Sequence, residues 1–418
     1  MKLIKGDIVY SGCNRELLEY RDSYLGFEGR YIKGIFSEIP EGEHEIIDRT
    51  GSIIIPGLVD LHLHAPQYPY AGLYMDDELL VWLDKHTFPM ESRYSDLEFA
   101  DKAYEIFAED LKMSETTRIS AFATIHKDAT LLLMRKLSEK GIRGFVGKVN
   151  MDRNCPDYLR EDTAQSLRDT ESFINESKGI EGIKPIITPR FTPSCTDELE
   201  SGLGDLSRRY GLPVQTHLDE NLDEIEWVKQ LCPWSSSYSD VYDSFGLFGD
   251  TPTIMAHVVW PHEDEIKLAK KKGIYIAHSP SSNGNIASGI APVRRYLDEG
   301  MNVGLATDVA GGSTLSLFRI MTEAIEQSKI RWRLLDRSLK PITFADGFYM
   351  ATRGGGSFFG KVGAFEEGYE ADILVIDAGR IRTALYDELR PAERLELYSS
   401  RYPGEFLTDK YIAGKKIF

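Results

Sequence analysis

The stretch Leu58–His64 reads LVDLHLH, a short and largely apolar run that ends in two closely spaced histidines. Runs of this kind are typical of strands that are buried on both faces of a parallel sheet. Seven similar stretches follow it along the chain, several of them separated by helical patterns. The eight predicted strands cover Leu58–His64, Ile119–His126, Gly144–Asn150, Ile183–Thr188, Leu212–Leu218, Thr253–His257, Ile274–His278 and Val303–Thr307. Alternating strands and helices indicate an α/β fold, and eight such units predict a TIM-type (β/α)8 barrel.

The two ends of the chain have a different character. Residues 1–55 contain short strand-like stretches that are broken by glycine, asparagine and proline turns, and residues 363–418 have the same pattern. Tyr411–Phe418 is predicted as the last strand. We expect these two segments to pair as one small β domain, with residues 56–362 forming the barrel.

Composition limits the classes of function. The chain of 418 residues carries a formal net charge of −17, which opposes nucleic-acid binding by repulsion or serves solubility alone. No apolar run is long enough for a membrane span, and the first residues lack the apolar core of a signal peptide. Four scattered cysteines form no disulfide framework. A cytoplasmic protein that takes a small molecule, without nucleic acid or membrane, fits these features.

Histidines and one aspartate stand at the ends of four predicted strands. His62 and His64 end the first strand and, two residues apart, point in the same direction. His217 ends the fifth strand, His257 ends the sixth, and Asp308 follows the eighth. Each histidine alone is better explained as a structural residue of the core or the surface. Because barrel strands converge at their C-terminal ends, the set together predicts a metal site there, and nitrogen ligands suit zinc.

Glu220 lies three residues after the predicted ligand His217. A metal-activated water needs a base that collects its proton, and a glutamate on the first turn after the strand fits this role. The alternative is a glutamate that merely stabilises the N-terminus of the following helix.

Two connections are longer than the fold requires and rich in aromatic residues. They are Ala65–Arg93 and Cys232–Asp250. Long loops in compact domains often cover binding sites, although surface packing or a dimer contact explains them equally well.

Seven motifs now point to one family. Pro56–Tyr68 (PGLVDLHLHAPQY), Thr188–Phe191 (TPRF), His217–Asn221 (HLDEN), Ala256–Trp260 (AHVVW), Ala277–Asn283 (AHSPSSN) and Thr307–Gly312 (TDVAGG) resemble, in order, the guanine deaminases of the amidohydrolase superfamily. Ala371–Asp377 (ADILVID) resembles the C-terminal β segment of that superfamily. HxH and TD occur throughout that superfamily, whereas PQY, TPRF and DVAGG are narrower signals. The resemblance implies hydrolysis of guanine to xanthine and ammonia.

The resemblance also implies roles for single residues. It places one zinc ion per chain on His62, His64, His217 and Asp308, with iron or manganese as alternatives. It places the purine against Gln67, Arg190, Phe191 and Glu220. It makes Glu220, His257 and Asp308 the catalytic residues: Glu220 and Asp308 transfer protons, and His257 orients the attacking oxygen. It further implies a homodimer.

Several alternatives remain open at this point. A two-metal relative would use a carboxylated lysine on the fourth strand, where only Lys184 is available, and the HxxE pattern of His217 and Glu220 favours one metal. Another aminohydrolase, acting on an adenosine-like nucleoside or an aminotriazine, is the nearest rival, since Ser281–Val293 resembles those enzymes too. A non-catalytic scaffold of the same fold is a further alternative. The HxE and PCxxC motifs of nucleic-acid deaminases are absent.

Two remaining features are interpreted as structural. The glycines at 354–356 and at 360 follow a helical stretch and lack the end of a phosphate loop, so we expect a helix stop and turn. His278 ends the seventh predicted strand, and it is expected to be structural or to lie behind the metal ligands.

Overall fold

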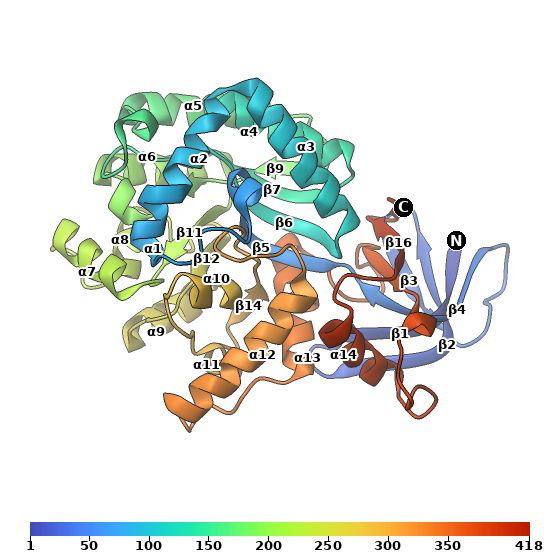
Figure 1. Cartoon of the computed structure of the whole chain (residues 1–418). Helices are drawn as coiled ribbons and strands as arrows, with labels where there is room; N and C mark the ends of the chain where they lie inside the picture. Colours follow the sequence, from blue (N-terminus) through green and yellow to red (C-terminus); the bar gives the residue numbers. More distant parts are fainter.

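The computed structural model describes all 418 residues, and parallel strands occupy the middle of the chain (Figure 1). These strands are β5 (Leu58–His64), β6 (Thr116–Phe122), β7 (Arg143–Gly147), β8 (Val149–Asn150), β9 (Ile183–Pro185), β10 (Thr188–Pro189), β11 (Val214–Leu218), β12 (Thr253–His257), β13 (Tyr275–His278) and β14 (Asn302–Leu305). They pair in the orders β5-β6-β7-β9, β8-β10 and β11-β12-β13-β14. Every predicted strand region therefore contains a strand, and the parallel α/β fold is confirmed.

Backbone contacts also connect the edges of the two four-stranded sheets. Ile187 forms a parallel bridge with Val214 on one side. On the other side, the backbone N–H of Asp308 donates to the carbonyl of His62, and that of His64 donates to the carbonyl of Val309. The ends of β5 and β14 therefore lie side by side.

Helices surround these strands (Figure 1). The α-helices are α1 (Leu79–Trp82), α2 (Phe88–Ser92), α3 (Leu97–Met113), α4 (Lys127–Glu139), α5 (Thr163–Glu176), α6 (Asp197–Tyr210), α7 (Leu222–Leu231), α8 (Tyr238–Ser244), α9 (Glu263–Lys272), α10 (Pro280–Asn285), α11 (Val293–Asp298), α12 (Leu317–Leu334), α13 (Phe344–Tyr349) and α14 (Pro391–Arg401). The shorter helical turns are η1 (Ala65–Tyr70), η2 (Leu83–Thr87), η3 (Arg93–Ser95), η4 (Asp157–Leu159), η5 (Thr192–Ser194), η6 (Met350–Gly354), η7 (Ser357–Phe359) and η8 (Ala378–Arg380). In α3, the Asp96 side chain accepts from the backbone N–H of Glu98, and a buried stripe that includes Phe107 and Leu111 faces the core.

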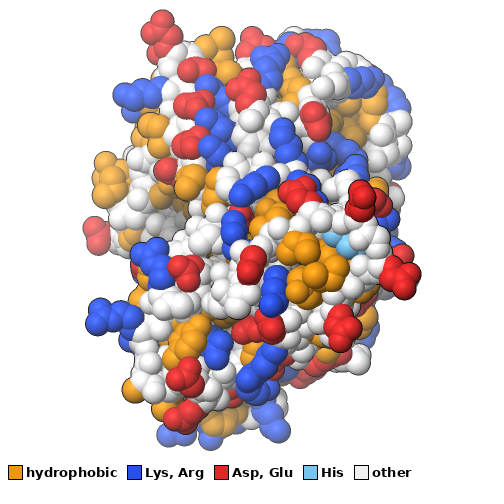
Figure 2. All heavy atoms as spheres, turned by 90° about the vertical axis from the view of Figure 1, so that its right-hand side faces the viewer, with side chains coloured by type: hydrophobic (Ala, Val, Ile, Leu, Met, Phe, Trp, Pro, Cys, Tyr) orange, Lys and Arg blue, Asp and Glu red, His pale blue; other side chains and the backbone are white.

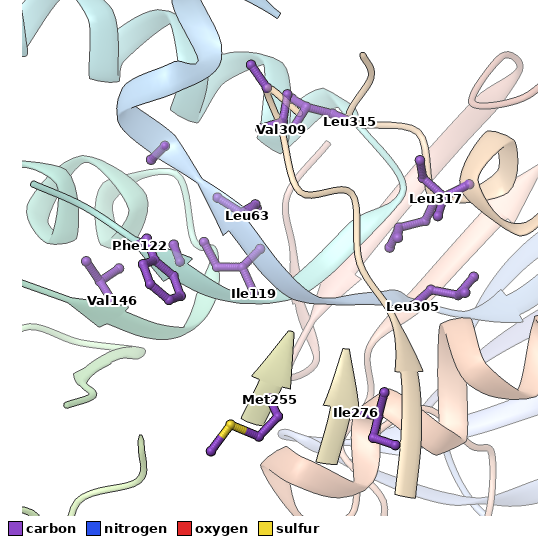
Figure 3. Close-up of a cluster of buried hydrophobic side chains, with 14 of the residues drawn as sticks. Leu63, Ile119, Phe122, Val146, Met255, Ile276, Leu305, Val309, Leu315 and Leu317 are labelled. Carbon is purple, nitrogen blue, oxygen red and sulfur yellow. The ribbon is translucent and has the colours of Figure 1, made fainter. Parts of the chain in front are cut away.

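The largest hydrophobic core lies among the parallel strands. Figure 3 shows Leu63, Ile119 and Val146 from β5 to β7, and Met255, Ile276 and Leu305 from β12 to β14. Burying a large aliphatic side chain of this kind contributes about 1.5–3 kcal/mol. The strand ends above this core are therefore held by a closely packed, rigid base.

The two ends of the chain form one seven-stranded sheet in the order β17-β16-β15-β4-β1-β2-β3 (Figure 1). Its strands are β1 (Lys2–Ser11), β2 (Leu17–Glu28), β3 (Tyr31–Phe36), β4 (Glu45–Pro56), β15 (Ile373–Ile376), β16 (Leu407–Ile412) and β17 (Lys415–Lys416). β15 lies antiparallel to β4, so the C-terminal segment pairs directly with the N-terminal one. A separate cluster of buried residues, including Ile4, Phe27 and Tyr411, packs on this sheet.

The C-terminal segment differs from its prediction in two ways. Only strands were expected in residues 363–418, but α14 lies among them because Pro391 occupies its first turn and Leu395 and Tyr398 are buried on one face. The predicted last strand is interrupted as well, since β16 ends at Ile412 and turns back into β17.

The glycine run at 354–356 was expected to stop the helix, but it does not. The helical path continues from α13 through Gly354–Gly356 to Phe359, and it ends at Gly360, whose φ is +100°. A Cβ on Gly354 would lie 2.5 Å from the carbonyl oxygen of Val303, closer than atoms pack. Gly354 therefore allows the helical segment to lie directly against β14.

The surface carries charges of both signs. In Figure 2, acidic and basic side chains lie interspersed between separate hydrophobic patches on the face that is shown. None of the helices combines the length and the apolar character that crossing a bilayer requires.

Candidate metal and active site

The predicted metal ligands come together at the C-terminal ends of the parallel strands. His62 Nε2 lies 3.0 Å from Asp308 Oδ1, and His64 Nε2 lies 3.4 Å from the same oxygen. His64 Nε2 and His217 Nε2 are 3.2 Å apart. Potential ligand atoms of His62, His64 and His217 lie within 4.8 Å of one another, as do those of His62, His257 and Asp308. One metal ion can therefore reach donors from β5, β11 and the segment after β14.

The hydrogen bonds around these side chains fit a metal. His62 is completely buried, yet neither of its ring nitrogens makes a hydrogen bond. His217 Nδ1 donates to the carbonyl of Arg190 at 2.6 Å, which leaves the Nε2 lone pair directed to the site. Buried polar atoms without partners are rare in proteins, so the free ring nitrogens of His62 fit a site that binds a cation. Imidazole nitrogens with one carboxylate are a donor set that suits zinc.

The electrostatics keep these groups in the forms that bind a metal. Burial lowers the pKa of His64 and His217 well below the ordinary value, and the neighbouring His62 lowers both further. Both rings are therefore neutral near pH 7. Burial alone would raise the pKa of Asp308, but His62 and His257 outweigh it and hold the pKa below its usual range. Asp308 is therefore a carboxylate.

Glu220 lies beside this cluster as a group with a high proton affinity. Burial raises its pKa well above the ordinary value, and the charge of Asp308 raises it further. The hydroxyl of Ser288 donates to Glu220 Oε1 at 3.0 Å and orients the carboxylate. Glu220 Oε2 lies 3.4 Å from His257 Nε2. His257 Nδ1 is in turn 2.9 Å from Asn283 Oδ1. A buried carboxyl group held in this way is suited to accept and return a proton.

Two of these residues have a strained backbone. His257 and Asp308 have φ angles of +73° and +46°, in the left-handed region that side chains with a Cβ rarely adopt. Such strain is common at functional sites, where the surrounding structure holds side chains in the required direction.

A cavity adjoins the candidate metal ligands, and the predicted substrate-binding residues line this cavity. Gln67, Arg190 and Phe191 are all buried and face the same space as Glu220. The lining consists of His64, Gln67, Leu79, Trp82, Leu83, Arg190, Phe191, His217, Glu220, His257, Ile286 and Asp308. A space with apolar walls and a few convergent polar groups is typical of a small-molecule site.

The two long connections differ in their relation to the cavity. Ala65–Arg93 contributes Leu79, Trp82 and Leu83 to the lining, so this segment covers the site. Cys232–Asp250 contributes no lining residue. Its Tyr242 donates a hydrogen bond to the carbonyl of His217 at 3.1 Å and therefore packs behind the strand end.

Sequence reasoning missed several residues of the site. Leu79, Leu83 and Ile286 gave no signal of their own, whereas Trp82 belongs to the aromatic-rich connection that was expected to cover a site. Ser288 and Asn283 lie in the quoted stretch Ser281–Val293, but no pattern indicated which residues would contact Glu220 and His257. Two other positions bear on the alternatives. Lys184 is exposed to solvent. His278 is buried behind the site without a hydrogen-bond partner, and burial lowers its pKa to about 3.

Comparison with known proteins assigns the chain to a family. Residues 53–398 match the model of the amidohydrolase family. The guanine deaminase of Dictyostelium discoideum is 41% identical over 90% of this chain and 89% of its own length. The 5′-deoxyadenosine deaminase of Methanocaldococcus jannaschii is 32% identical over 84% and 81%.

A solved structure extends the likeness to the whole chain. The structure of the guanine deaminase of C. acetobutylicum was determined with guanine bound in the active site. It is 45% identical in sequence and has a TM-score of 0.96, and the match covers 100% of both chains. The chain therefore belongs to the amidohydrolase family and, within it, to the guanine deaminases.

Proposed function

We propose that this protein hydrolyses guanine to xanthine and ammonia. The observation that carries the proposal is the single cavity that joins the cluster of histidines and Asp308 to Gln67, Arg190, Phe191 and Glu220. Two guanine deaminases resemble this chain over most or all of its length, and one of them was determined with guanine in its active site.

The cavity offers partners for each part of the base. Arg190 donates hydrogen bonds, which suits the C6 carbonyl oxygen of guanine, and the amide of Gln67 both donates and accepts. Phe191 presents its ring to the flat face of the purine. Because buried polar groups are left unpaired when an analogue lacks the matching group, this lining selects against such analogues.

His62, His64, His217 and Asp308 would hold one zinc ion per chain, and the unpartnered nitrogens of the cluster support this assignment. When bound, zinc supplies Lewis-acid activation of a water molecule for attack at neutral pH. The exposed position of Lys184 supports a single metal, because a carboxylated lysine bridging two ions would have to point into the site.

The proton transfers fall to this chain's own residues. Glu220 accepts a proton from the attacking water and delivers it to the ring nitrogen next to C2. His257, with Nδ1 donating to Asn283, presents Nε2 to the attacking oxygen and orients it. Asp308 Oδ2 lies on the His257 side, 3.7 Å from Nε2, and takes the second proton to the leaving amine. The new C2–O bond replaces the bond between C2 and the exocyclic amine nitrogen, and ammonia departs.

We also propose that the parallel strands close into a barrel. The contacts at Ile187–Val214 and at His62–Asp308 support a closed (β/α)8 barrel made of the two parallel sheets. Residues 56–362 would form this catalytic unit, with residues 1–55 and 363–418 as the β domain. A homodimer in the cytoplasm stays a prediction.

Turnover of a panel of amines by the purified, zinc-loaded protein tests the proposal. Guanine, adenine, guanosine, cytosine and an aminotriazine are compared, with released ammonia and the product base quantified. We expect a clear preference for guanine. Preference for a nucleoside or a triazine would instead favour the rival aminohydrolase activity and remove the roles of Gln67 and Arg190. Metal binding without any turnover would favour a scaffold.

A further inference from the structure

We propose that Glu91 is a positioning residue that sets the orientation of both base-recognising side chains, and thereby the selectivity for a purine that carries the C6 carbonyl. This inference rests on the proposed function, since it concerns the same cavity. Glu91 itself does not line the cavity, and nothing in its local sequence marks it.

One carboxylate serves both recognition residues. Arg190 Nη1 donates to Glu91 Oε2 at 2.5 Å, and Gln67 Nε2 donates to Glu91 Oε1 at 2.9 Å. The amide oxygen of Gln67 also accepts from the backbone N–H of Ala310 at 3.3 Å. The direction of the Gln67 amide is therefore determined, because a flipped amide would set its oxygen against Glu91 and its NH2 against another donor.

A second residue of the same helix holds Arg190 in place. The guanidinium carbon of Arg190 lies 5.2 Å from the centre of the Phe88 ring, within the range of a cation–π contact. Phe88 and Glu91 are three residues apart in α2 and so lie on one side of it. Helix α2 thus fixes the guanidinium by its face and by one of its nitrogens, leaving its other nitrogens to donate to a ligand.

Burial indicates what the ion pair does. The side chains of Arg190 and Glu91 are only 3% and 2% exposed. Removing two charges from water to this degree costs free energy, and their mutual attraction often does not compensate for it. Such pairs therefore contribute little to the stability of the fold. Their geometric effect is strong, because bonds to a charged group are short and directional. The pair therefore orients the two side chains more than it stabilises the fold.

The same contacts connect recognition to the cover of the cavity. Helix α2 follows η2 and α1 directly, and these turns supply Leu79, Trp82 and Leu83 to the cavity wall. Glu91 ties this covering segment to Arg190, which follows β10. Arg190 and Gln67 are therefore held in position only when the covering segment Ala65–Arg93 is in place.

Substitution of Glu91 combined with two ligands tests the inference. Hypoxanthine keeps the C6 carbonyl and lacks the C2 amine, whereas unsubstituted purine lacks both, so neither is consumed. Their dissociation constants are measured on the zinc-loaded protein and on Glu91→Gln. A glutamine has one acceptor oxygen and cannot serve both donors. We expect hypoxanthine to bind about 10- to 100-fold more weakly to the variant, as for loss of a charge-assisted contact, with purine changed less than about 2-fold. For guanine, KM rises more than kcat falls.

Further variants separate positioning from a general structural role. Phe88→Leu keeps an apolar side chain and should weaken hypoxanthine binding in the same direction by about 3-fold, which gives a second reading if Glu91→Gln does not fold. Glu161→Gln is the matched control. Glu161 is a carboxylate paired at 2.6 Å with the buried Lys148, outside the cavity. It should leave the hypoxanthine-to-purine ratio unchanged.

Equal loss of affinity for hypoxanthine and purine, or no loss for either, would overturn the role of Glu91. So would a wild-type protein that binds the two ligands equally. Failure of the proposed function is read separately, because it appears as absence of guanine turnover in the wild-type protein.

Discussion

Buried polar and charged groups differ in their hydrogen-bond partners between the two ends of the parallel strands. Where β6 meets the β sheet, Arg118 Nε binds Asp372 Oδ2 at 2.5 Å and Nη2 binds Glu370 at 2.6 Å. Lys410 Nζ donates to three backbone carbonyls at the C-terminal end of α3, those of Leu111, Lys112 and Ser114. At the C-terminal ends, by contrast, His62 and His257 leave ring nitrogens without partners. The buried charges of the first region have partners within the protein, whereas the unpartnered nitrogens of the second are available to a ligand. Polar groups of the first kind hold the fold, and those of the second carry the chemistry.

The strongest test of this contrast changes Glu220 at the reactive end. Glu220→Gln keeps the size and a hydrogen-bond acceptor for Ser288 but no longer accepts a proton, so kcat should fall by about 10²- to 10⁴-fold. Zinc content, measured on the same preparation, should stay that of the wild-type protein, because the proposed metal ligands are unchanged. A fully active variant would refute the role as base.

Arg118→Met tests the other end. Asp372 is completely buried, so removal of Arg118 leaves an uncompensated carboxylate and should destabilise the protein by about 3–5 kcal/mol. Chemical denaturation measures this change. The kcat of the folded variant should equal that of the wild-type protein, and a large fall in kcat with unchanged stability would erase the distinction between the two regions.

Ser288→Ala has the smallest expected effect and sharpens the boundary of the reactive region. Its hydroxyl donates to Glu220 and forms no hydrogen bond with a proposed metal ligand. Loss of one hydrogen bond to a charged group should lower kcat by about 10-fold, with stability and zinc content almost unchanged. Steady-state kinetics beside a thermal unfolding scan decide it. Unchanged kcat would show that Glu220 is oriented without this contact.

The same difference explains how far the sequence could be interpreted. Strands such as β5 and β12 have the predicted bounds because a buried parallel strand is a local apolar pattern. His62, His64 and Glu220 were marked because each lies at a strand end or soon after one, where topology brings side chains together. Gln67, Arg190 and Phe191 have no such local mark and were found through the family resemblance alone.

Other features depend on contacts that are distant in sequence. Glu91 and Arg190 are 99 residues apart, and Ser288 and Glu220 are 68 apart. No periodic pattern encodes such a pairing. The continuation of the helix through Gly354–Gly356 depends on close packing against β14 in the same way. Helix α14 is different, because Pro391 in its first turn and the three-residue spacing of Leu395 and Tyr398 form a local pattern that was overlooked.

Titration of the metal-free protein with zinc tests the central claim most directly. Zinc is removed with a chelator, added back in steps, and guanine turnover and the unfolding temperature are measured at each step. The account predicts no turnover without metal, a linear rise that ends at one zinc per chain, and a parallel rise in unfolding temperature as the unpartnered nitrogens gain their ligand. Full turnover by the metal-free protein, or a rise that continues to two zinc ions per chain, would contradict it.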